Sequence, residues 1–103
     1  MEKNKKKKLE QAGWKVGSSK EFLGMDDAEA GLVAIRVSLA KSIRARRKAA
    51  GLTQAQVAKQ AETTQARVAK AENASPEISI DLCIRLLLSL GANPTKIAKA
   101  IAA

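Results

Sequence analysis

TQAQVAKQAETTQARVAKAE, residues 53–72, is the stretch that decides the fold. Thr53 and Thr64 each precede a short run in which small apolar residues recur at helical spacing, and threonine is a preferred N-cap. Gln56 follows Thr53 by three residues and completes a capping box. We therefore predict two short helices joined by a tight turn. The residues expected to pack inward are Val57, Ala58 and Ala61 from the first helix, and Val68 and Ala71 from the second, which would end near Asn73.

Longer helices are predicted on both sides of this pair. One would begin at Asp26 or Asp27 and end before Gly51, because glycine readily adopts the positive φ of a helix stop. A second would be capped by Ser79 and closed by Gly91, and a third would open at Asn93 and Pro94. The apolar residues assigned to these helices are Leu32, Ile35, Leu39, Ile43, Leu82, Cys83, Leu86, Leu87, Leu90, Ile97 and Ile101. Ile78, just before the Ser79 cap, is spaced to form a hydrophobic staple with Cys83.

Composition agrees with an all-α protein. The chain has 103 residues, enough for one compact domain, and only 2% aromatic residues, so its core is expected to be aliphatic. Polar and apolar residues rarely alternate, which gives little support to β-sheet. We divide the chain into a basic, partly disordered extension, residues 1–24, and a helical domain, residues 25–103. The lone Cys83 is expected to be a core residue, and no internal disulfide can form.

The charge favours a polyanionic partner. The formal net charge is +9, and the basic residues gather at Lys3 to Lys8 and at Lys41 to Lys48. Such an excess favours nucleic acid first and an anionic membrane surface second. Within the second cluster, Arg46 and Arg47 are predicted to contact phosphates. The first cluster is either a solvated tail or an arm that follows the minor groove.

Enzyme chemistry finds little support. The sequence has no histidine and one cysteine, so a Cys/His metal site is excluded, and no pair of carboxylates is spaced for acid–base work. No glycine-rich phosphate loop occurs, and we expect no metal and no cofactor. No apolar run is long enough for a membrane span or an export signal, so a cytoplasmic protein on the nucleoid is expected.

The order T-Q-x-x-V-A, T-Q-x-x-V and E-N, inside a basic helical chain, resembles the helix-turn-helix of XRE-type, lambda-repressor-like regulators. The resemblance covers about residues 40–100. It implies a five-helix domain whose second short helix enters the major groove of an operator. The sequence departs from the family at Glu62 and Ala74, where glycine is usual, and at Ala71, where a larger apolar residue is usual.

The resemblance also implies roles for individual residues. Gln65 and Ala66 would read bases, with the Gln65 amide suited to adenine and the Ala66 methyl to thymine. Lys70 would reach guanine or phosphate. The residues implied to contact or approach phosphates are Gln54, Thr64, Arg67 and Asn73. Gln54 is also implied to brace the first reading residue.

The segment WKVGSSKEFLGMDD, residues 14–27, resembles the front of HigA-like antitoxins, which pair with RelE-like toxins. If the resemblance holds, Trp14, Val16, Phe22 and Leu23 would anchor a toxin, because aromatic side chains suit interface hot spots. The alternative is that they fasten the segment to the helical core. A homodimer is expected, with residues 86–101 as its interface. Alternative functions are a phage- or plasmid-type repressor without a toxin and a charge-driven RNA-binding protein.

Overall fold

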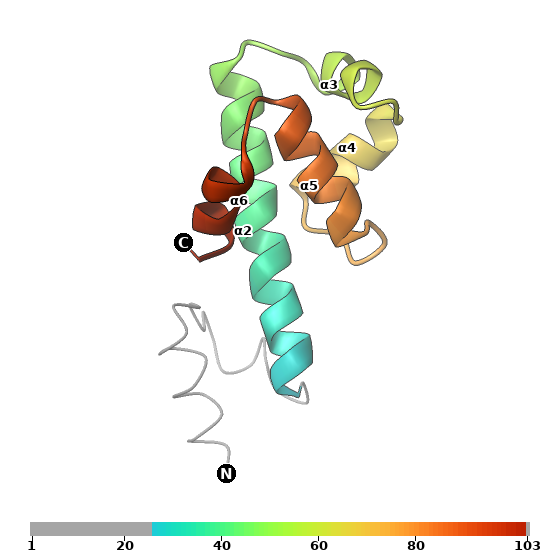
Figure 1. Cartoon of the computed structure of the whole chain (residues 1–103). Helices are drawn as coiled ribbons and strands as arrows, with labels where there is room; N and C mark the ends of the chain where they lie inside the picture. Colours follow the sequence, from blue (N-terminus) through green and yellow to red (C-terminus); the bar gives the residue numbers. More distant parts are fainter. Residues whose placement is uncertain (1–25, 103) are drawn as a thin grey trace.

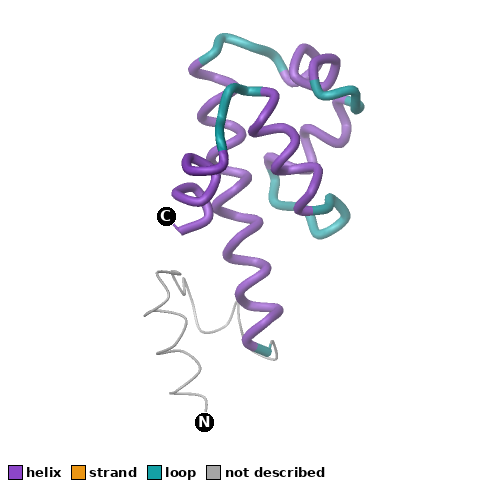
Figure 2. Tube along the Cα trace, in the orientation of Figure 1, coloured by secondary structure: helices purple, strands orange, loops and turns teal. Residues whose placement is uncertain are grey.

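The computed structural model describes residues 26–102, which form five helices and no strand (Figures 1 and 2). The all-α prediction is thereby confirmed. The predictions on Lys3 to Lys8 and on Trp14, Val16, Phe22 and Leu23 lie outside the described residues. The helices are α2 (Asp27–Ala49), α3 (Gln54–Gln60), α4 (Gln65–Glu72), α5 (Ile80–Ser89) and α6 (Pro94–Ala102).

Helix α2 is the longest helix of the described residues, and α4, α5 and α6 all pack against it. Its N-cap is Asp26, whose carboxylate accepts the Glu29 N–H at 2.7 Å. At the other end Gly51 adopts φ 70°, as its position after the last turn predicts. Leu39 and Ile43 are fully buried and carry the contact of α2 with the core.

The predicted apolar stripe of α2 is wrong at its first residue, because Leu32 is 47% exposed. The N-terminal half of this 23-residue helix extends beyond the other helices (Figure 1), so the apolar stripe continues past the core, which Leu32 does not join. Val33 and Val37 are also exposed on this half. The result is an apolar surface on α2 made of Leu32, Val33 and Val37.

The two short helices begin where their threonines predict. Thr53 Oγ1 accepts the Gln56 N–H at 3.1 Å and Gln56 Oε1 accepts the Thr53 N–H at 2.8 Å, which completes the capping box. Thr64 Oγ1 accepts the Arg67 N–H at 3.3 Å. Glu62, in the turn between the helices, has φ 57°. The turn thus takes the left-handed conformation that usually favours glycine.

Helices α5 and α6 close the core. Ser79 caps α5 by accepting the Leu82 N–H at 3.1 Å, and Asn93 caps α6 by accepting the Lys96 N–H at 2.9 Å. Cys83 is 3% exposed, and burial raises the pKa of its thiol, which fits a core residue. No helix in residues 26–102 is long and apolar enough to cross a membrane. The core residues are Leu39, Ile43, Val57, Ala58, Ala61, Val68, Ala71, Ile78, Cys83, Leu86, Leu87, Ala92 and Ile97.

Candidate nucleic-acid interface

Helix α4 has a buried face and an exposed face. Val68 and Ala71 are at most 1% exposed and pack into the core. The other face is open to solvent from the first residue of the helix to its C-cap. This outer face brings most of the predicted recognition residues together on one side of one helix, and its exposed members are Gln65, Ala66, Arg67, Lys70 and Asn73.

A buried carboxylate fixes the inner face of α4 to the rest of the domain. The Glu72 side chain is 0% exposed. Arg47 of α2 donates to it twice, from Nε to Oε2 at 2.6 Å and from Nη2 to Oε1 at 2.9 Å. Gln54 of α3 donates from Nε2 to Oε1 at 3.3 Å, and Arg44 Nε lies 3.5 Å from the same oxygen. One side chain thus ties α4 to both α2 and α3.

The ionisation of Glu72 reflects this surrounding. Burial by itself raises the pKa of a carboxyl group, because it disfavours the charged form. The hydrogen bonds from Arg47, Gln54 and Arg44, together with the charge of Arg47, outweigh burial and hold the pKa of Glu72 below its ordinary value of 4.5. Hydrogen bonding to Glu72 likewise raises the pKa of Arg47. The network is therefore an ion pair at neutral pH.

The two arginines predicted to contact phosphates have different surroundings. The Arg47 side chain is 14% exposed, and besides binding Glu72 it donates from Nη1 to the Leu52 carbonyl at 3.1 Å. These bonds occupy its guanidinium, so we leave Arg47 out of the proposed DNA surface. Arg46 is half-buried and forms no ion pair with any residue of the described part of the chain.

Two polar residues implied to reach phosphates also join the Glu72 network. Gln54 is half-buried, and its amide N–H is directed to Glu72. In residues 26–102 no hydrogen bond joins Gln54 to Gln65, so the implied bracing is not seen in the free protein. Asn73, the C-cap of α4, accepts from Arg44 Nη2 at 3.5 Å. Gln54 is therefore held by Glu72 itself, and Asn73 contacts the network only through Arg44.

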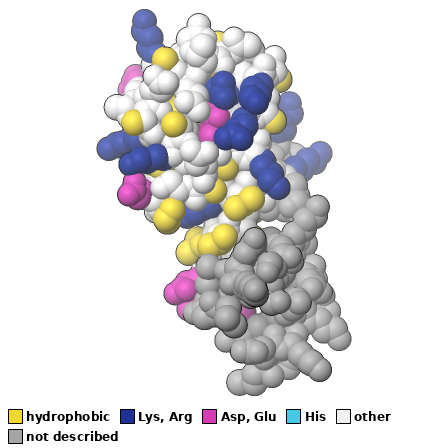
Figure 3. Space-filling model, turned by 180° about the vertical axis from the view of Figure 1, so that it is seen from behind, with side chains coloured by type: hydrophobic (Ala, Val, Ile, Leu, Met, Phe, Trp, Pro, Cys, Tyr) yellow, Lys and Arg dark blue, Asp and Glu magenta, His cyan; other side chains and the backbone are white. Residues whose placement is uncertain are grey.

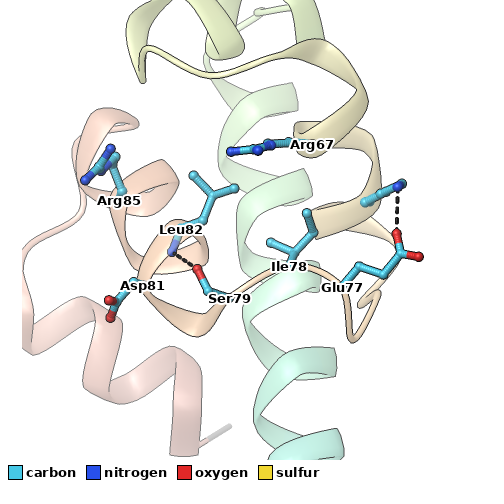
Figure 4. Close-up of a pocket in the computed structure, with 8 residues that line it drawn as sticks. Arg67, Glu77, Ile78, Ser79, Asp81, Leu82 and Arg85 are labelled. Atoms are coloured by element: carbon cyan, nitrogen blue, oxygen red, sulfur yellow. Dashed lines mark hydrogen bonds and ion pairs between the residues drawn. The ribbon is translucent and has the colours of Figure 1, made fainter.

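A groove runs between α4 and α5. Its volume is about 500 Å³, and charged side chains line both of its sides. Arg67 extends from α4 toward α5, and the dashed line at Glu77 marks its ion pair with Lys70 (Figure 4). The Lys70 Nζ to Glu77 Oε2 distance is 2.6 Å, and the hydrogen bond from Lys70, together with its charge, lowers the pKa of Glu77. The full lining is Arg67, Lys70, Glu77, Ile78, Ser79, Asp81, Leu82 and Arg85.

Several basic side chains lie on the face of the domain that Figure 3 shows. Lys41 and Lys48 of α2 and Lys59 of α3 are all exposed, as is Arg44. Such side chains attract a polyanion without reading its sequence. Of these residues, Arg44 borders the outer face of α4, because its Nη2 lies 3.5 Å from Oδ1 of Asn73.

Sequence reasoning missed two residues that fix α4 and the loop after it, Glu72 and Arg36. Glu72 follows Val68 by four residues, so it lies on the buried face of α4, and this spacing was the available signal. Arg36 was missed as well. It donates to the carbonyls of Ser75 and Ile78 from 39 and 42 residues away, and no local pattern announces such a contact.

A protein-family model described as helix-turn-helix (HTH_3) matches residues 43–97, from the second half of α2 into α6. The chain belongs to this helix-turn-helix family. The match confirms the XRE-type resemblance and, with it, a DNA-binding domain of the kind found in transcription regulators. Searches among curated proteins and among solved structures gave no match.

Proposed function

We propose that this protein is a homodimeric transcriptional repressor that reads its operator with the outer face of α4. The observation that carries the proposal is the pairing of an exposed polar face with a buried ion pair on the same helix. A helix so fixed can present side chains to base edges in a constant register. A major groove about 12 Å wide admits one such helix.

Each exposed residue receives a role that its chemistry permits. The Gln65 amide both donates and accepts, so it matches the N6 and N7 edge of adenine, while Ala66 contacts a thymine methyl. Lys70 donates to guanine O6 or N7. Thr64 and the first N–H groups of α4 receive a phosphate. The other proposed phosphate contacts are Gln54, Arg67, Asn73 and Arg46.

Selection from a pool of random duplex DNA, with the full-length protein, tests this function. We expect enrichment of a two-fold symmetric site, because a symmetric dimer reads two half-sites about one helical turn apart. Binding to the selected duplex should survive competition from double-stranded RNA of the same sequence, whose narrow major groove excludes a helix. Equal competition by that RNA would instead support the charge-driven alternative, and failure to enrich any duplex would refute sequence reading.

The proposed dimer interface is narrower than the predicted range, residues 86–101. Leu86 and Leu87 are fully buried in the core of one protomer, so they cannot contact a partner. Leu88, by contrast, is 49% exposed on the opposite side of α5. We place the interface around Leu88. Leu88→Asp should shift the sedimentation coefficient from dimer to monomer, whereas the equally exposed Leu32→Asp should not.

We further propose that the protein is the antitoxin of a toxin–antitoxin pair, acting in the cytoplasm on the nucleoid. In this proposal residues 1–24 bind the toxin and residues 25–103 bind DNA. Support comes from the exposed apolar surface on α2, which directly follows the proposed toxin-binding segment and would extend it. Trp14→Ala should abolish co-purification with a RelE-like product of the adjacent gene while leaving DNA binding intact. Retained co-purification would instead favour the alternative that Trp14 fastens its segment to the helical core. Failure of the unmodified protein to capture such a product would favour a repressor without a toxin.

A further inference from the structure

The Lys70–Glu77 pair places an acid beside a residue that is proposed to read DNA. Both side chains are well exposed, 52% for Lys70 and 67% for Glu77, yet the ion pair is close at 2.6 Å. Glu77 belongs to the loop between α4 and α5, and Figure 4 shows its carboxylate turned toward α4. Before DNA arrives, the Lys70 ammonium therefore already has an anionic partner.

The loop that carries Glu77 is fixed to the core at several points. Ile78, the next residue, is 5% exposed. Arg36 of α2 donates to the Ile78 carbonyl and, at 3.4 Å, to the Ser75 carbonyl. The Glu77 N–H itself donates to Ser75 Oγ at 3.2 Å. These contacts hold the backbone of Glu77 in place, so its side chain stays within reach of α4 whether or not Lys70 stays paired.

We infer that Glu77 is a specificity-determining residue, which competes with DNA for Lys70 and disfavours duplexes that offer Lys70 only phosphate charge. The inference rests on the proposed reading of DNA by α4. An exposed ion pair is weak, so a duplex can break it. Once Lys70 has turned to the duplex, however, the unpaired carboxylate is left on the anchored loop near the duplex and repels its phosphates.

The two kinds of duplex should respond differently to this repulsion. On random sequence, Lys70 gains only a screened charge interaction, which the nearby carboxylate largely offsets. On a selected site, Lys70 also gains hydrogen bonds to guanine O6 or N7, which random sequence does not offer in the same register. Glu77 should therefore weaken random-sequence binding more than selected-site binding.

Glu77→Gln tests the inference, because it removes the charge and keeps the shape. The matched control is Glu29→Gln, the same substitution in the first turn of α2, beyond the contacts of α4 (Figure 1). Affinities of full-length protein are measured for a random-sequence duplex pool and for the duplex selected from it. We expect Glu77→Gln to raise random-sequence affinity about two- to fivefold, the scale of an exposed pair, and to raise selected-site affinity less.

A double-mutant cycle separates this role from a simple change of net charge. In a Lys70→Met background, Glu77→Gln should no longer lower the ratio of selected-site to random-sequence affinity. The inference is overturned if Glu77→Gln behaves like Glu29→Gln, or if its effect on that ratio persists in full without Lys70. Absence of duplex binding by the unmodified protein would instead refute the proposed function, so the two failures are distinguishable.

Discussion

The ion pair on the inner face of α4 is buried, whereas the ion pair on its outer face is exposed. On the inner face, Glu72 is fully buried and Arg47 nearly so, and their two hydrogen bonds connect α4 to α2. On the outer face, Lys70 and Glu77 form a single contact that is open to water. The difference teaches that the inner charges hold the helix, whereas the outer charges remain available to a partner. Substitutions on the inner face should therefore change stability, and those on the outer face should change DNA binding.

The largest effect is expected from Glu72→Gln. This substitution leaves Arg47 with an unpaired charge in a site where its side chain is only 14% exposed. Removing one partner of a buried pair costs about 3–5 kcal/mol of unfolding free energy, and we expect the lower end because Arg47 retains some contact with water. Chemical denaturation followed by circular dichroism measures it. Glu29→Gln is the exposed control, and a similar small effect for both variants would break the comparison.

The difference in stability between the buried Glu72 pair and the exposed Glu77 pair should also appear at acidic pH. Because folding lowers the pKa of Glu72 below 4.5, its stabilising contribution is complete above that pH and is lost as the pH falls through the folded pKa. The pKa of Glu77 is lowered as well, but its pair is exposed and weak. Below pH 5 the unfolding free energy should therefore depend less on pH in Glu72→Gln than in the unmodified protein. In Glu77→Gln this pH dependence should stay nearly the same. Equal changes would contradict the assignment.

Gln65→Ala should affect the outer face alone. Gln65 is exposed at the first position of α4, so its truncation should leave the unfolding free energy within about 0.5 kcal/mol. Loss of one bidentate base contact should cost about 1–3 kcal/mol of discrimination at a single base pair. Affinities for a panel of single-base variants of the selected duplex measure this. An unchanged preference at every position would remove Gln65 from the reading surface.

The smallest effect is expected from Arg46→Ala, which should weaken binding to all sequences alike. One lost phosphate contact should make the slope of log affinity against log salt shallower by about 0.9. The neighbouring Arg47→Ala is the natural comparison, because it should lower the melting temperature through loss of the Glu72 pair. If Arg46→Ala left the salt dependence unchanged, the phosphate contact would be disproved.

Local signals explain why so much of the fold was predictable. Thr53, Thr64 and Ser79 each cap the helix that follows them, and a cap needs only the next few residues. The Arg47–Glu72 pair joins residues 25 apart in the sequence, and Arg47 looked like one more basic residue of a charged cluster. Its partner could be found only once α2 and α4 had been placed together.

One other prediction failed and a second has to be narrowed, because periodicity does not reveal where a core ends. Leu32 continues the stripe of α2, but that part of the helix extends past the other elements. Leu86 and Leu87 looked suitable for a partner, yet a small domain needs them for its own interior, where both are fully buried. The roles of the exposed residues of α4 stay predictions, because they depend on a duplex.

Glu62 and Ala74 bracket α4, and both have φ 57° without being glycine. A Cβ atom confines a left-handed residue to a small region of conformation, whereas glycine in the same place samples a broad one. The two joints of α4 are thus stiffer than glycine joints, at a cost to folding of about 1–2 kcal/mol each. Because these two residues restrict how α4 can be oriented, the helix has less orientational entropy to lose when it binds a duplex. The backbone strain at Glu62 and Ala74 therefore lowers the entropic cost of binding DNA.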